Sequence, residues 1–190
     1  KITFKPAVRD EVTFSYHSGD DFLDYFRDRD NDGVGITTRF ASGNNSQSLS
    51  WKRQMFSGWS AEVLAMRTAY RYRVENFFEE NALFAQSRIE DYGVKAIFTR
   101  DSLWRDSRTR VGVEWIRHSV SPVVVNTAGW YGEYLESSQS GARYANQLAM
   151  HAQHEWLFSD RLRVNLGVRG SMAFVENTNY SYAEPRISLR

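Results

Sequence analysis

The strict alternation of apolar and polar side chains constrains the fold of this sequence more than any other feature. In the segment WLFSDRLRVNLGVRG, at 156–170, the side chains of Leu166 and Val168 point to one side of an extended strand, and those of Asn165 and Arg169 point to the other. Such a strand needs an apolar environment on one side only. The alternation therefore predicts antiparallel β-structure and raises the question of what covers its apolar side.

The same alternation recurs along the whole chain and predicts about nine strands. Several of them reach about ten residues, which is longer than the usual five or six of globular sheets. A length near ten with continuous alternation is what a tilted, membrane-spanning strand requires. The alternating segments are 11–17, 48–55, 60–75, 91–100, 110–115, 143–158, 161–169 and 184–190.

Composition favours a structure that is apolar outside and polar inside. Only 42% of the 190 residues are hydrophobic, yet 15% are aromatic, which is unusual for a packed soluble domain. The absence of cysteine excludes a disulfide framework and a thiolate metal site. A formal net charge of +1 gives no strong field for nucleic acid, and we expect no nucleic-acid partner.

The predicted connections alternate between short and long, as in outer-membrane β-barrels. Short turns are expected near 56–59, 101–107 and 159–160, and longer polar loops near 18–46, 76–82, 121–142 and 175–181. Aromatic residues also lie towards the strand ends, where lipid headgroups would be. A soluble β-sandwich with alternating strands is the competing interpretation.

Several segments resemble the barrel of TonB-dependent outer-membrane receptors. The residues ARYANQLAMHAQHEWLFSDRLRVNLGVRG followed by YAEPRISLR are similar to a strand, a short periplasmic turn and the returning strands of that family. DYGVKAIFTR with RTRVGVEWIRHSVSP, preceded by TAYRYRVE, resembles strands of its Bacteroidetes members. The resemblance covers roughly 47–190 and implies active nutrient uptake across a Gram-negative outer membrane.

The fold class expected from this resemblance is an all-β, antiparallel transmembrane β-barrel, present only in part. Receptors of this family have 22 strands around a plug domain, and about nine strands cannot form that barrel. We therefore expect 1–190 to be a portion of one barrel domain whose plug is not in this chain. A self-contained small barrel, acting as an anchor or adhesin, remains an alternative.

The resemblance also implies partners and a set of interior residues. The partners would be outer-membrane lipid, the receptor's own plug domain, TonB and a surface lipoprotein, and the loops at 18–46 and 121–142 would contact substrate or partners. The residues expected to face the lumen or plug, called here the predicted lumen set, are Arg67, Arg71, Arg73, Arg110, Glu114, Glu155, Arg163, Arg169, Glu184 and Arg186.

One segment resembles half of a calcium loop. In DRDNDG, at 28–33, Asp28, Asp30 and Asp32 precede a glycine with the spacing of calcium-binding oxygens. Arg39 stands where the bidentate glutamate should be, so an acidic, solvated loop is the competing interpretation. No other cofactor is expected.

The remaining candidate chemistry does not assemble into a catalytic set. His151 and His154 lie at an odd offset on a strand, which sends them to opposite faces and excludes a shared metal. The same argument places Ser119 and its neighbour His118 on opposite faces. His118 and His151 are expected on the same face, where they could share a proton or ion. The carboxylates Glu114, Glu155 and Asp91 are surrounded by arginines, which indicates charge ladders and not an enzyme.

Overall fold

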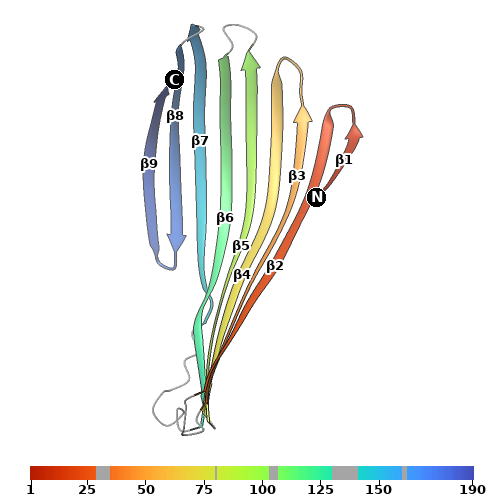
Figure 1. Cartoon of the computed structure of the whole chain (residues 1–190). Helices are drawn as coiled ribbons and strands as arrows, with labels where there is room; N and C mark the ends of the chain where they lie inside the picture. The colour runs from red at the N-terminus through yellow and green to blue at the C-terminus, as the bar shows by residue number, and fades with distance from the viewer. Residues whose placement is uncertain (29–34, 80, 103–106, 130–140, 160–161) are drawn as a thin grey trace.

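The structure, a computed structural model, is one antiparallel sheet of nine strands in which every strand pairs with its neighbours in sequence (Figure 1). It describes residues 1–28, 35–79, 81–102, 107–129, 141–159 and 162–190. The strands are β1 (Ile2–Ala7), β2 (Asp10–Asp28), β3 (Gly35–Gln54), β4 (Trp59–Phe78), β5 (Asn81–Ser102), β6 (Ser107–Ala128), β7 (Arg143–Ser159), β8 (Leu162–Val175) and β9 (Thr178–Leu189). The predicted all-β antiparallel fold is confirmed.

The central strands are about twice as long as a bilayer requires. β3 and β4 have 20 residues each, and β5 and β6 have 22 each, against about ten for a tilted spanning strand. The predicted short turn near 56–59 is in place between β3 and β4, and the strand bounds leave only short connections at 103–106 and 160–161. The predicted long loops are shorter than expected, and the longest connection between strands is 129–142. The segment 18–46 is mostly strand, since β2 continues to Asp28 and β3 begins at Gly35. β6 likewise continues to Ala128, inside the expected loop 121–142.

The sheet is a single layer without a packed core. Among the described residues the buried hydrophobic side chains are only those of Ala61, Ala82 and Ala149, and none of the large side chains is fully buried. A β-sandwich would bury the facing sides of two sheets against each other, and the described residues form one sheet only. The competing sandwich interpretation is therefore wrong for this part of the chain.

A tight turn fixes the start of the central hairpin. Ser57 and Gly58 join β3 to β4 with φ of 59° and 76°. The amide of Met55 donates to the carbonyl of Trp59 at 2.7 Å, and the amide of Asp101 on β5 donates to the carbonyl of Gly58 at 2.9 Å. This turn therefore holds the ends of three strands together. No helix in the described residues is long and apolar enough to cross a membrane.

Candidate functional site

The register divides the side chains between two faces, because residues paired across antiparallel strands point to the same side. One row crosses every strand and consists of apolar residues and one glycine: Phe4, Val12, Trp51, Val63, Ala96, Val113, Met150, Gly170 and Ala183. The rows beside it add Leu49, Ala65, Val94, Trp115, Leu148 and Met172 on one side, and Ala61, Phe98, Val111, Ala152 and Val168 on the other. We call this side of the sheet the banded face and the opposite side the charged face.

The apolar band has the height of a bilayer core and then stops. On β4 it runs from Trp59 to the residue before Arg67, a length close to the nine to eleven residues of a tilted spanning strand. The next row of the banded face, towards the long connections, is polar and contains Tyr16, Gln47, Arg67, Tyr92, Arg117 and Asn146. Beyond this row the banded face of β2 to β4 carries further charged side chains, among them Asp20, Arg71 and Arg73.

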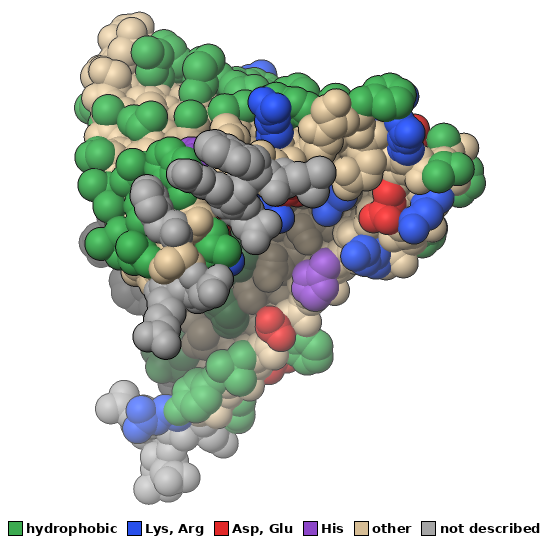
Figure 2. Space-filling view, turned by 90° about the horizontal axis from the view of Figure 1, so that it is seen from above, with side chains coloured by type: hydrophobic (Ala, Val, Ile, Leu, Met, Phe, Trp, Pro, Cys, Tyr) green, Lys and Arg blue, Asp and Glu red, His purple; other side chains and the backbone are tan. Residues whose placement is uncertain are grey.

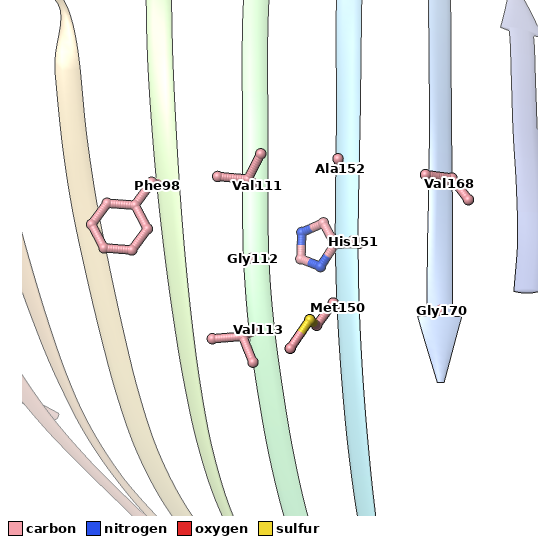
Figure 3. A pocket seen from close by; sticks show the side chains of 9 residues that line it. All are labelled: Phe98, Val111, Gly112, Val113, Met150, His151, Ala152, Val168 and Gly170. Atoms are coloured by element: carbon pink, nitrogen blue, oxygen red, sulfur yellow. The ribbon is translucent and has the colours of Figure 1, made fainter. Parts of the chain in front are cut away.

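The banded face is hollowed where its residues are small. A depression of about 500 Å³ lies over β5 to β8, and its lining includes the small band residues Ala152 and Gly170 between Phe98 and Val168 (Figure 3). Behind it the ring of His151 lies across Gly112 of the neighbouring strand, where a Cβ would come within 2.4 Å of the ring. Gly112 thus leaves the space that the histidine fills on the charged face.

The charged face carries a ladder of ion pairs. Arg169 donates through Nη2 to Oε2 of Glu114 at 3.2 Å, and Nζ of Lys95 lies 4.0 Å from the other oxygen of that carboxylate. Further pairs join Arg163 to Glu155 at 2.8 Å and Arg186 to Glu184 at 3.0 Å. Seen along the strands, charged and histidine side chains gather around a hollow, while hydrophobic side chains lie along the outer margins (Figure 2).

Histidines on the charged face are separated from one another. Nδ1 of His118 lies 2.8 Å from Oδ1 of Asp91 on the neighbouring strand. His151 pairs with Gly112, three rows away from His118, which is about 20 Å along the strand. The two histidines therefore do not share a proton or ion. His154 lies on the banded face, beside Thr109, as the odd offset predicted.

The predicted lumen set is divided between the faces. Arg110, Glu114, Glu155, Arg163, Arg169, Glu184 and Arg186 lie on the charged face. The register instead places Arg67, Arg71 and Arg73 on the banded face, which corrects the expectation that the whole set shares one side. The cause is β4, where the apolar residues Leu64 and Met66 are on the charged face, whereas the band residues after Trp59 are the small Ala61, Val63 and Ala65.

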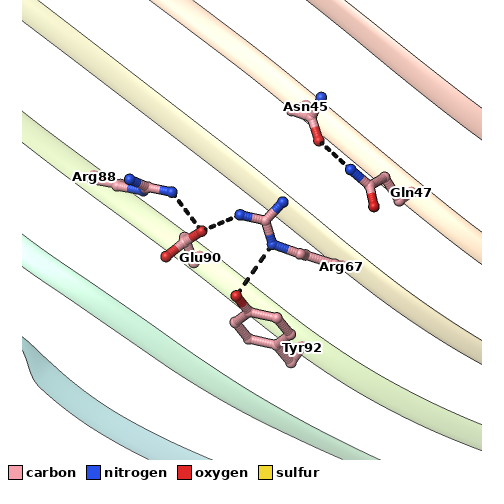
Figure 4. Close-up of polar contacts among 6 residues, drawn as sticks. All are labelled: Asn45, Gln47, Arg67, Arg88, Glu90 and Tyr92. Atoms are coloured by element: carbon pink, nitrogen blue, oxygen red, sulfur yellow. Dashed lines mark hydrogen bonds and ion pairs between the residues drawn. The ribbon is translucent and has the colours of Figure 1, made fainter.

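Arg67, one of the displaced arginines, belongs to a polar cluster beside the band (Figure 4). Arg67 and Arg88 both donate to the same oxygen, Oε1 of Glu90, at 2.6 and 2.7 Å, and Arg67 also donates to the hydroxyl of Tyr92 at 3.2 Å. Burial raises the pKa of Glu90, but the hydrogen bonds from Arg88 and Arg67 outweigh this effect, so the pKa lies below its usual value. The carboxylate therefore stays ionised between two guanidinium groups.

The calcium prediction lies at the edge of what the structure describes. Asp28 is the last residue of β2, whereas Asp30 and Asp32 lie outside the described residues. The remainder of the described chain has no group of three or more metal-binding side chains. Calcium binding at 28–33 stays a prediction.

Ser119 lies on the banded face with Tyr144, whereas its neighbour His118 lies on the charged face beside Asp91.

Solved transporters and receptors share this fold. The chain superposes on the ferric citrate transporter FecA with a TM-score of 0.60 and 12% identity, covering 98% of this chain and 32% of that one. It matches the alcaligin outer-membrane receptor FauA of Bordetella pertussis (TM-score 0.57, 10% identity, 98% and 30% covered). It also matches BauA, the ferric preacinetobactin receptor of Acinetobacter baumannii (TM-score 0.57, 9% identity, 98% and 41% covered).

These similarities establish the fold and its extent. All three proteins are described as transporters or receptors and none as an enzyme, and this chain spans between about a third and two fifths of their length. No protein-family model matches the sequence. No curated protein matches it either. The nine strands thus have the fold of part of a receptor barrel.

Proposed function

We propose that this chain forms part of the wall of a TonB-dependent transporter in the outer membrane of a Gram-negative bacterium. In this arrangement the apolar band contacts lipid and the charged face lines the lumen. The observation that carries the proposal is the continuous apolar row across all nine strands, which has no protein cover among the described residues. An exposed apolar surface of this size in a single-layer sheet is stable in lipid and not in water.

The charged face supports a role in holding a plug. The Glu114 carboxylate, with 17% of its side chain exposed, lies between the two cations Arg169 and Lys95. Such side chains can exchange partners with polar groups of a domain inside the barrel. The energy of transport would then reach the plug through TonB, while the wall stays rigid.

Finer assignments rest on the sequence resemblance. The strand pair at 91–121 supports a Bacteroidetes-type receptor, and with it a surface lipoprotein that would meet the long connections. The transported compound stays open between siderophores, vitamins, glycans and peptides. Calcium at 28–33 would order the β2–β3 connection.

Depletion of nutrients by living cells tests the proposed transport. We expect deletion of the gene to abolish removal of one class of compound from the medium, measured by untargeted mass spectrometry. The same loss should follow when a protonophore collapses the inner-membrane gradient in wild-type cells, because TonB draws its energy from that gradient. Re-expression of the gene in the deletion strain is the control.

Two outcomes would contradict the proposal in different ways. Depletion that needs the gene but survives the protonophore would indicate a passive channel. Unchanged depletion, together with loss of adhesion or envelope integrity, would favour the small structural barrel.

A further inference from the structure

We propose that Arg67, Arg71 and Arg88, called here the arginine cradle, bind the phosphate of an anionic lipid headgroup on the outer surface of the barrel. This inference rests on the membrane placement in the proposed function, but not on transport. It starts from the register, which puts the three arginines on the same side of the sheet as the apolar band, at and beyond its polar edge.

The cradle lies at the level of the headgroups. Arg67 occupies the first polar row beyond the apolar band, next to Tyr92 and in the same row as Tyr16. Tyrosine prefers the boundary between hydrocarbon and water. Arg71 and Arg88 pair with each other two rows further out. A lipid whose chains lie on the band would therefore place its phosphate beside these guanidinium groups.

The cradle is hollow and has the polar groups that a phosphate needs. A depression of about 270 Å³ is lined by all three arginines together with Ser18, Asn45 and Gln47. Asn45 donates to the hydroxyl of Tyr16 at 3.1 Å, and Gln47 donates to Asn45 at 3.2 Å, so the floor is already ordered. Guanidinium groups bind phosphate oxygens in a bidentate manner and with defined geometry.

The arginine cradle and the carboxylates that it contacts have a net positive charge. Glu90 is shared by Arg67 and Arg88, and Asp20 accepts from Arg71 at 3.1 Å. Three cations therefore meet two carboxylates. The side chains of Arg71 and Arg88 remain 72% and 54% exposed, so their remaining donors can reach a ligand. Arg73 extends the positive surface but is paired with Glu75 at 2.7 Å.

Lipid binding by the full-length protein in detergent tests the proposal. The probe is diphosphoryl lipid A, with the same lipid after enzymatic removal of its phosphates as the comparison, and native mass spectrometry gives the occupancy. Each arginine near an anionic headgroup contributes roughly fivefold in affinity, so Arg67→Gln with Arg88→Gln should weaken binding about 25-fold. Arg110→Gln, on the charged face, should leave it unchanged.

A second variant separates binding from a structural role. Glu90→Gln removes a negative charge from the cradle and should strengthen lipid A binding several-fold, whereas a purely structural Glu90 would give no gain. Equal binding of the dephosphorylated lipid, or full competition by equimolar inorganic phosphate, would overturn the headgroup assignment.

Membrane insertion is measured in parallel to keep the two proposals distinct. If the double variant inserts into nanodiscs and binds lipid A like the wild type, the proposed lipid binding by the arginine cradle is wrong. The transporter proposal would not be affected. If the wild-type protein does not insert at all, the membrane placement itself is wrong.

Discussion

Two neighbouring positions of the β3–β4 turn, 57 and 58, both have a positive φ but differ in the side chain that they carry. Gly58 has φ of 76°, and a Cβ there would lie 2.3 Å from the carbonyl oxygen of Asp101, which is backbone and cannot move aside. Ser57 also has a positive φ, 59°, although it carries a side chain. The left-handed conformation costs a non-glycine residue about 1–2 kcal/mol. The turn therefore has one position that requires glycine and one that would accept it.

Substitutions in this turn should act with opposite signs. We expect Gly58→Ala to lower the free energy of unfolding by about 2 kcal/mol or more, through strain and the clash with Asp101. Ser57→Gly should raise it by up to about 1 kcal/mol, because the strain is relieved. Thermal unfolding followed by circular dichroism in detergent measures both. A stabilising Gly58→Ala would contradict the turn geometry.

Individual strands show which parts of the fold the sequence could predict. On β8 and β6 the larger apolar residues all lie on one side, so alternation identified the faces correctly. On β4 both sides carry apolar residues, and the banded face holds the small residues Ala61, Val63 and Ala65, so hydrophobicity alone grouped β4 differently from the register. For this reason three arginines of the banded face were included in the predicted lumen set.

The outer halves of the strands were missed for a different reason. From 18 to 27 the described side chains are exposed on both faces, and apolar and polar residues do not alternate there. These segments are strands because each residue pairs with a partner across the hairpin, as Asp20 does with Gly43. Pairing of this kind leaves no signal in a single sequence. Calcium binding by Asp30 and Asp32 stays a prediction.

β7 offers a matched test of the two faces. Met150 lies in the middle of the band and is 58% exposed, whereas Gln153 lies on the charged face opposite Arg110. In lipid, Met150→Asp should cost about 2–3 kcal/mol, somewhat less than a lysine or arginine would. Gln153→Asp should be neutral or favourable, because it faces a cation. Unfolding in urea from lipid vesicles gives both values, and equal, small effects would contradict the lipid-facing assignment.

At the scale of the whole molecule, the described sheet is open. β1 pairs only with β2 and β9 only with β8 within the described residues. In hydrocarbon each unpaired backbone group costs several kcal/mol, so a membrane-spanning sheet must close. The proposal therefore requires further strands at both edges.

The intact mass of the mature polypeptide tests this requirement. Denaturing mass spectrometry of the detergent-extracted protein should give a mass several times the 22.1 kDa of this chain, because the missing strands and plug would belong to the same polypeptide. A mass of 22.1 kDa would instead mean that these strands close or assemble with copies of themselves, as in the small-barrel alternative.

A scan of spin labels along β6 tests the central claim, that the banded face contacts lipid. The chain contains no cysteine, so a single cysteine can be placed in turn at each position from 109 to 117 and labelled with a nitroxide in the membrane-embedded protein. We predict that collision with oxygen is high at Val111, Val113 and Trp115 and low at Arg110 and Glu114, with a period of two. Collision with a water-soluble nickel chelate should never be high at the first three positions. A profile without this period, or with the phase reversed, would show that the banded face does not contact lipid.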